Sequence, residues 1–96
     1  MGIAASQARL TMITARQSDL EFQMQSISQQ RSVLALQAAQ SQDTNSSQSA
    51  QLQAVDKQLE SKMLQLQTQQ KMVNTEYDSV KKTMDDSITR SFKTLA

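Results

Sequence analysis

The side chains that could take part in acid–base or metal chemistry are carboxylates and amines, because the chain has no histidine and no cysteine. Asp85 and Asp86 are neighbours in sequence, and neighbouring residues of a helix point to different sides, so they cannot form one general acid–base site. Asp78 offers too few nearby oxygen ligands for a metal ion. Gly2 is the only glycine, so there is no glycine-rich phosphate loop. We therefore expect a non-enzyme with no catalytic residue, no metal site and no cofactor.

The charge balance argues against nucleic acid as a partner. Ten basic and nine acidic residues give a net charge of +1, far from the strongly basic balance typical of nucleic-acid binding. The basic residues of the C-terminal part do not align into one stripe: Lys71, Lys81, Lys82, Arg90 and Lys93. No stretch approaches the roughly 20 apolar residues that span a bilayer, and the first residues lack the pattern of a cleaved secretory signal. We expect neither nucleic-acid binding nor membrane insertion.

Two long segments with helical spacing flank one polar cluster, residues 43–47, whose Asp, Thr, Asn and Ser side chains favour turns. No proline occurs, so nothing with a strong breaking tendency interrupts either segment. The sequence predicts an all-α fold: one hairpin over residues 1–96, with a helix at about 4–41, a polar turn at about 42–48 and a second helix at about 49–94. The alternative is a single unbroken helix, in which the polar segment would stay helical without a partner.

Apolar residues recur at three- and four-residue steps along both segments, as in coiled coils. Gln17 and Arg31 interrupt this stripe in the first segment, and Asp56 and Glu60 repel each other in the second. We expect the two helices to pack antiparallel along a coiled-coil-like intramolecular seam formed by Leu10, Ile13, Leu20, Met24, Ile27, Leu34, Leu52, Leu59, Leu66, Val73 and Val80.

A second apolar set lies on a different side of the first helix, at Ala8, Ala15, Phe22 and Leu36, with Met12 and Val33 near its edges. One partner helix cannot cover both sets, so this face would stand in water in a lone hairpin. The chain is only 3% aromatic and two helices bury little surface, so a lone hairpin would be weakly stable. We expect assembly with other copies. The alternative is that Phe22 and Leu36 are scattered exposed residues.

The segment from Tyr77 to Lys93 resembles the C-terminal helix of type III secretion needle subunits and, more loosely, of the axial proteins of flagellar and type III systems. The matching positions are Val80, Lys81, Asp85 or Asp86, Ile88, Phe92 and Lys93. The resemblance implies a short helical hairpin that is exported through a type III or flagellar-type channel and polymerises, with its C-terminal helix lining the inner wall. Together with the second apolar set, it predicts an intersubunit interface at Ala8, Ala15, Phe22, Leu36, Met84, Ile88, Phe92 and Leu95.

The expected function is that of a bacterial structural subunit, exported without signal cleavage to the cell surface or beyond, which self-assembles into a helical filament or needle-like tube. Its expected partners are other copies, and an export chaperone is a further candidate. The alternative is a cytoplasmic coiled-coil adaptor or export chaperone that stops at a dimer or four-helix bundle. A membrane-surface helix is a weaker third interpretation, because neither helix combines a strongly basic face with bulky aromatic anchors.

Overall fold

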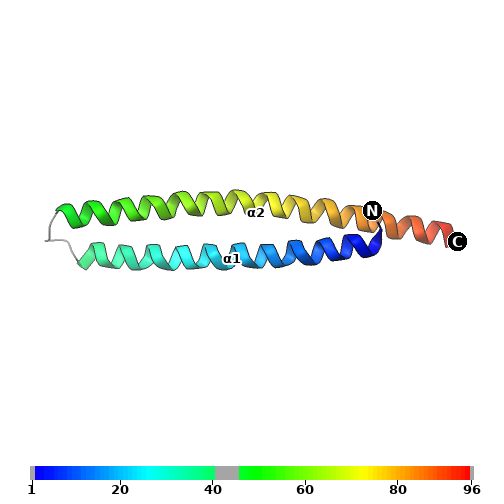
Figure 1. Ribbon diagram of the computed structural model, residues 1–96, viewed down its shortest axis with the longest axis horizontal. Coiled ribbons are helices and arrows are strands. Elements are labelled where there is room, and N and C mark those ends of the chain that lie inside the picture. Colours follow the sequence, from blue (N-terminus) through cyan, green and yellow to red (C-terminus); the bar gives the residue numbers. More distant parts are fainter. Residues whose placement is uncertain (1, 41–45, 96) are drawn as a thin grey trace. The chain divides into compact units, whose positions relative to one another are not determined.

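The chain forms two long helices that pack antiparallel as a helical hairpin in a computed structural model (Figure 1). Helix α1 covers Ile3–Gln40 and helix α2 covers Ser46–Leu95. The structure describes residues 2–40 and 46–95, with only the backbone of residues 46 and 47. Throughout these residues no φ angle is positive and no peptide bond is cis, as expected for segments without proline and with one terminal glycine. The predicted all-α hairpin is confirmed, and the single unbroken helix is excluded.

The helix bounds differ from the predicted ones by a few residues. Residues 46–48, predicted to belong to the turn, are helical and form the start of α2, and α1 begins one residue earlier and α2 ends one residue later than predicted. The physical reason is that serine and glutamine cost only a few tenths of a kcal/mol in a helix, so polar composition alone does not fix the residue at which a helix begins. The remaining predicted turn positions up to residue 45, together with residue 41, lie outside the described residues.

The hairpin divides into two compact units, each made from one stretch of α1 and one of α2. We call Met1–Leu20 with Gln69–Ala96 the terminal unit, and Glu21–Thr68 the central unit. Such a division arises because a residue in a two-helix hairpin contacts mainly residues at its own level on the other helix.

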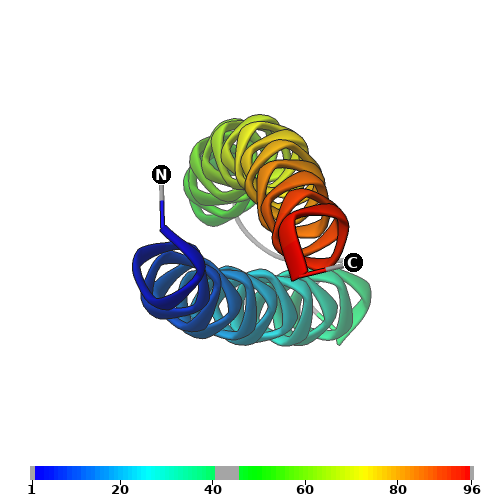
Figure 2. The ribbon, with the colours of Figure 1, turned by 90° about the vertical axis from the view of Figure 1, so that its right-hand side faces the viewer.

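The core of the terminal unit contains Ile13 and Leu20 of α1 with Val73 and Val80 of α2, each at most 5% exposed. Ser6 continues the same seven-residue spacing on α1 and is also fully buried. Figure 2 views this unit from its open end, with the last turns of α2, in red, nearest the viewer. The seam of the terminal unit is therefore a row of aliphatic side chains that ends in a hydroxyl.

The core of the central unit is thinner. Ile27 and Leu66 are its buried apolar residues, each 5% exposed. The seam continues through half-buried residues, namely Met24, Leu34, Leu52, Leu59 and Met63. Fewer apolar side chains are fully removed from water in this unit than in the terminal unit. Covering its exposed apolar residues would therefore add proportionally more to its stability.

Candidate interaction surface

More large apolar side chains are exposed than buried among the described residues. Six are buried: Ile13, Leu20, Ile27, Leu66, Val73 and Val80. Nine are between 43% and 86% exposed: Met12, Phe22, Val33, Leu36, Val55, Leu64, Met72, Phe92 and Leu95. Single exposed apolar residues are normal on protein surfaces, but exposed apolar residues that share one face mark a binding surface.

The predicted seam and the predicted interface fall into different environments. Every predicted seam residue is buried or half-buried: Leu10, Ile13, Leu20, Met24, Ile27, Leu34, Leu52, Leu59, Leu66, Val73 and Val80. Of the predicted interface residues, Ala8, Ala15, Phe22, Leu36, Phe92 and Leu95 are exposed, whereas Met84 and Ile88 are half-buried. The interface residues lie in both units, so they do not make up one described site.

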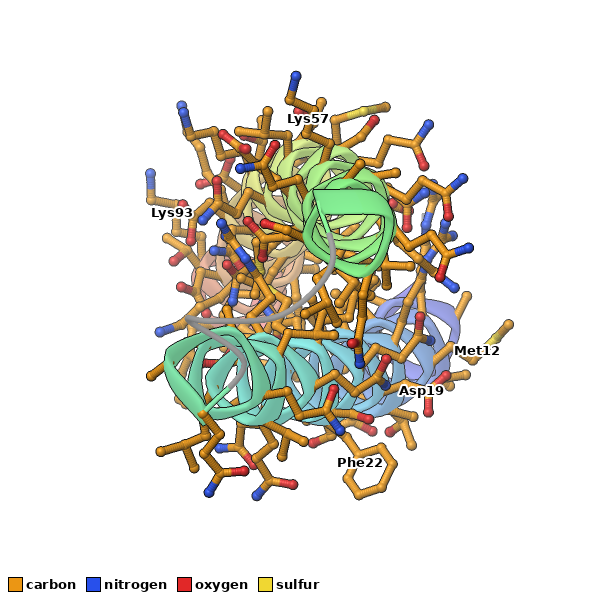
Figure 3. The ribbon with its side chains drawn as sticks, turned by 90° about the vertical axis from the view of Figure 1, so that its left-hand side faces the viewer. Met12, Asp19, Phe22, Lys57 and Lys93 are labelled. Atoms are coloured by element: carbon orange, nitrogen blue, oxygen red, sulfur yellow. The ribbon has the colours of Figure 1, made fainter. Side chains whose placement is uncertain are left out.

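One exposed apolar surface lies on α1 in the central unit, where Phe22 is 71%, Val33 52% and Leu36 63% exposed. We call these three residues the outer α1 face. The ring of Phe22 points away from α2, whereas Lys57 on α2 points away from α1 (Figure 3). From Phe22 to Gln40 the sequence contains a single charged residue, Arg31. A solvent-exposed helix usually carries charges of both signs, and loss of charge is typical of the core of a protein interface.

A second exposed apolar surface lies at the end of α2 in the terminal unit. Every residue from Thr89 to Leu95 is exposed, and we call this stretch the C-terminal segment. Phe92 is 71% and Leu95 86% exposed, and they lie four and seven residues after Ile88, on one helical face. In Figure 1 these last turns run past the start of α1, which explains why nothing in the described chain covers them.

Arg31, one of the two polar interruptions of the predicted seam, forms an ion pair with Asp56 inside the central unit. Its Nε donates to Asp56 Oδ1 at 2.9 Å and its Nη2 donates to Oδ2 at 3.4 Å. The hydrogen bond from Arg31, together with its positive charge, lowers the pKa of the Asp56 carboxyl. The bond to Asp56 raises the pKa of Arg31, and the negative charge of Glu60 contributes in the same direction. Arg31 thus offsets the repulsion predicted between Asp56 and Glu60.

The other interruption, Gln17, is paired as well. In the terminal unit its Nε2 donates to Asn74 Oδ1 at 2.7 Å. Nearby, Arg9 Nη2 donates to Glu76 Oε1 at 3.0 Å, with both side chains more than 40% exposed. An exposed pair of this kind contributes at most about 1 kcal/mol to stability. Both seam interruptions therefore have partners across the hairpin.

Sequence reasoning missed these partners, although an approximate signal for one of them exists. Arg31 lies 12 residues before the first residue of the polar cluster, Asp43, and Leu59 lies 12 residues after its last residue, Ser47. Because antiparallel helices place residues equidistant from their connection side by side, counting outward from the cluster puts Arg31 level with Leu59, which is three residues from Asp56. The sequence therefore brings Arg31 within one helical turn of Asp56 but does not single out Asp56 as the partner.

Ser6 is the unusual polar residue of the terminal unit. Its side chain is fully buried, and its Oγ has no hydrogen-bond partner. Its backbone N–H donates to the carbonyl oxygen of Gly2 at 3.0 Å. Other helical hydroxyls in the chain, such as those of Thr11 and Thr75, donate to the carbonyl four residues earlier. Ser6 therefore loses its hydration without compensation.

The described residues were also compared with the requirements of a metal site and of a membrane span. Residues 2–40 and 46–95 contain no group of three acidic or metal-ligating side chains placed to hold a metal ion. Neither α1 nor α2, over its described length, has the apolar run that a membrane span requires.

Compared with protein-family models, with curated proteins and with solved structures, the chain matches none of them.

Proposed function

We propose that this chain is a structural subunit that self-associates through the outer faces of its helical hairpin. The observation that carries this proposal is the excess of exposed over buried large apolar side chains, nine against six among the described residues. Water-exposed apolar surface is removed most simply by packing against further copies, which also strengthens a marginal two-helix core.

The proposal extends to an open-ended assembly because the two exposed apolar surfaces belong to different units. The outer α1 face lies in the central unit, and the C-terminal segment lies in the terminal unit. A subunit with one self-complementary surface stops at a dimer, whereas a subunit with two independent surfaces can continue to add copies. A subunit that uses both exposed apolar surfaces therefore assembles into a filament.

The narrower proposal is an exported filament or needle-like tube at the bacterial cell surface. Its support is the resemblance of the segment from Tyr77 to Lys93 to type III needle subunits. In that case the C-terminal segment faces the neighbouring subunits at the inner wall, and Ile88, Phe92 and Leu95 hold them together.

The second candidate is a coiled-coil adaptor or export chaperone that forms a dimer or four-helix bundle in the cytoplasm. It is favoured by the single charge between Phe22 and Gln40, because a neutral outer α1 face is enough to build a bundle from two hairpins. Under this function the C-terminal segment remains free or contacts a different protein.

Electron microscopy and sedimentation across a concentration series separate these functions. The filament predicts long uniform fibres of the wild-type protein, and predicts that Phe22→Asp and Phe92→Asp each abolish fibres while the circular dichroism stays helical. Leu64→Asp is the matched control, since Leu64 is 58% exposed on α2 and belongs to neither surface. A discrete dimer or tetramer at every concentration would support the adaptor instead, and a monomer throughout would refute both functions.

A further inference from the structure

The first two turns of α1, residues 3–9, bury little of their surface against α2. We call this segment the lid. The side chain of Ser6 is fully buried and that of Ile3 is half-buried, whereas the other five residues of the lid are exposed. The residues of α1 that follow pack more deeply, since Leu10 is half-buried and Ile13 is 5% exposed. The lid therefore supplies little of the apolar contact that stabilises the terminal unit.

Several polar features of the lid favour its separation from α2. The buried Oγ of Ser6 has no hydrogen-bond partner among the described residues, and it would regain its hydration if the lid opened. The first turn of α1, from Ile3 onward, contains no acidic residue to offset the positive end of the helix dipole. Gly2, just before this turn, supplies no side-chain oxygen to bond the first amides. The ion pair of Arg9 with Glu76 is exposed, so it adds little to the closed state.

The lid lies over the end of the buried seam of α2. Arg9 pairs with Glu76, and Ser6 lies three residues before Arg9, so it is level with about residue 79 of the antiparallel α2. Val80 is next to this level and is 5% exposed. Val73 lies three residues before Glu76, so it is level with about residue 12 of α1, outside the lid. Opening of the lid would therefore expose Val80 and leave Val73 buried.

Val80 begins a row of apolar side chains at four-residue steps along α2. The row continues with Met84, Ile88 and Phe92, which follow one another on adjacent turns. Exposure rises along it, because Val80 is 5% exposed, Met84 and Ile88 are half-buried, and Phe92 is 71% exposed. With the lid closed, only the far end of the row is accessible. With the lid open, the row would be accessible from Val80 onward.

We propose that the lid opens from α2 while the rest of the hairpin stays folded, and that the closed lid hides the inner half of this apolar row. The unpaired hydroxyl of Ser6 keeps the closed state weak enough to open. Segments with few buried apolar contacts are those that open locally, below the free energy of global unfolding. The inference concerns a conformational equilibrium of one chain, so it goes beyond the proposed function and does not depend on it.

Thiol labelling measures this opening, because the chain has no cysteine of its own. Val80→Cys and Val73→Cys are matched probes, since both valines belong to the seam of α2 and are 5% and 4% exposed. A buried thiol reacts only when it becomes accessible. We expect Val80→Cys to react at least about tenfold faster than Val73→Cys, because local opening exposes the first residue but not the second. Low urea concentrations should accelerate Val73→Cys much more than Val80→Cys, because the lid exposes little surface when it opens.

A second change in the Val80→Cys background tests the role of Ser6. Ser6→Ala removes the unpaired hydroxyl and should slow the labelling about tenfold. Ser18→Ala is the matched control, because Ser18 is exposed on α1 outside the lid and is helical in both states, so it should leave the rate unchanged. Circular dichroism of each variant checks that the hairpin is intact. Hydrogen exchange of the wild-type protein gives the same comparison without a cysteine, between the amides of residues 6–9 and those of residues 13–20.

Several outcomes overturn the inference. It is wrong if Val80→Cys and Val73→Cys react at the same rate and with the same urea dependence, since both thiols then become accessible in one larger unfolding event. It is also wrong if Ser6→Ala leaves the labelling of Val80→Cys unchanged, or if Ser18→Ala slows it equally. None of these results bears on self-association, which sedimentation of the wild-type protein decides separately.

Discussion

Replacing Ser6 with alanine should stabilise the hairpin, although the change removes a polar group from a natural helix. The Oγ atom is fully buried and unpaired, and an unsatisfied buried hydroxyl costs about 1–3 kcal/mol. Alanine is also the better helix former, by about 0.5 kcal/mol. The small void left by one oxygen atom offsets part of this gain. We expect a net stabilisation of about 1–3 kcal/mol, which raises the melting temperature by several degrees for a chain of 96 residues.

Urea unfolding followed by circular dichroism measures this effect, and Ser18→Ala supplies the matched control. Ser18 lies on α1 in the same unit but is exposed, so its replacement changes helix propensity alone, by about 0.5 kcal/mol. The difference between the two variants isolates the cost of burying the hydroxyl. Equal effects of the two variants, or a loss of stability in Ser6→Ala, would show that the Ser6 hydroxyl has a partner and that the reasoning is wrong.

Two further predictions concern the central unit. Leu66→Ala should destabilise the protein by about 2–5 kcal/mol, because Leu66 is only 5% exposed. Leu64→Ala should cost less than about 1 kcal/mol, because Leu64 is 58% exposed. The urea midpoints of the two variants measure these effects, and equal midpoints would contradict the described seam. Asp56→Asn should reduce the dependence of stability on acid pH. Because Arg31 lowers the pKa of Asp56 in the folded protein, this carboxylate contributes stability above its unfolded pKa of about 3.9 and loses it as pH falls through the lower folded pKa. The wild type should therefore lose more stability than Asp56→Asn between neutral pH and about pH 2, and parallel losses in urea titrations would argue against the pairing with Arg31.

The two helices and the side chains of their seam were predictable from hydrophobic periodicity, and the polar cluster at residues 43–47 predicted the reversal between the helices. Leu59, Leu66 and Val73 recur at intervals of seven, and nothing in either segment breaks a helix. The exposed position of Phe22 follows from the same argument, since it lies on the side of α1 opposite the seam. Local periodicity is sufficient for these features because each concerns one helix and its nearest neighbour.

Other features of the structure could not be predicted from the sequence pattern. The start of α2 at Ser46 was placed too late, because polar composition resembles a turn even where the backbone stays helical. The pairing of Gln17 with Asn74 depends on the relative level of the two helices, which periodicity does not set.

The pairing of Arg31 with Asp56 also bears on how the hairpin avoids misfolding. A slide of one helix past the other by seven residues would still place apolar residues opposite apolar residues, because the seam repeats at that interval. The slide that brings Arg31 to the level of Ser49 would leave a half-buried guanidinium without a carboxylate beside it. A hairpin slipped in this direction is therefore less stable, because one half-buried charge lacks its partner. The ion pair thus favours the correct register, which a purely aliphatic seam would not do.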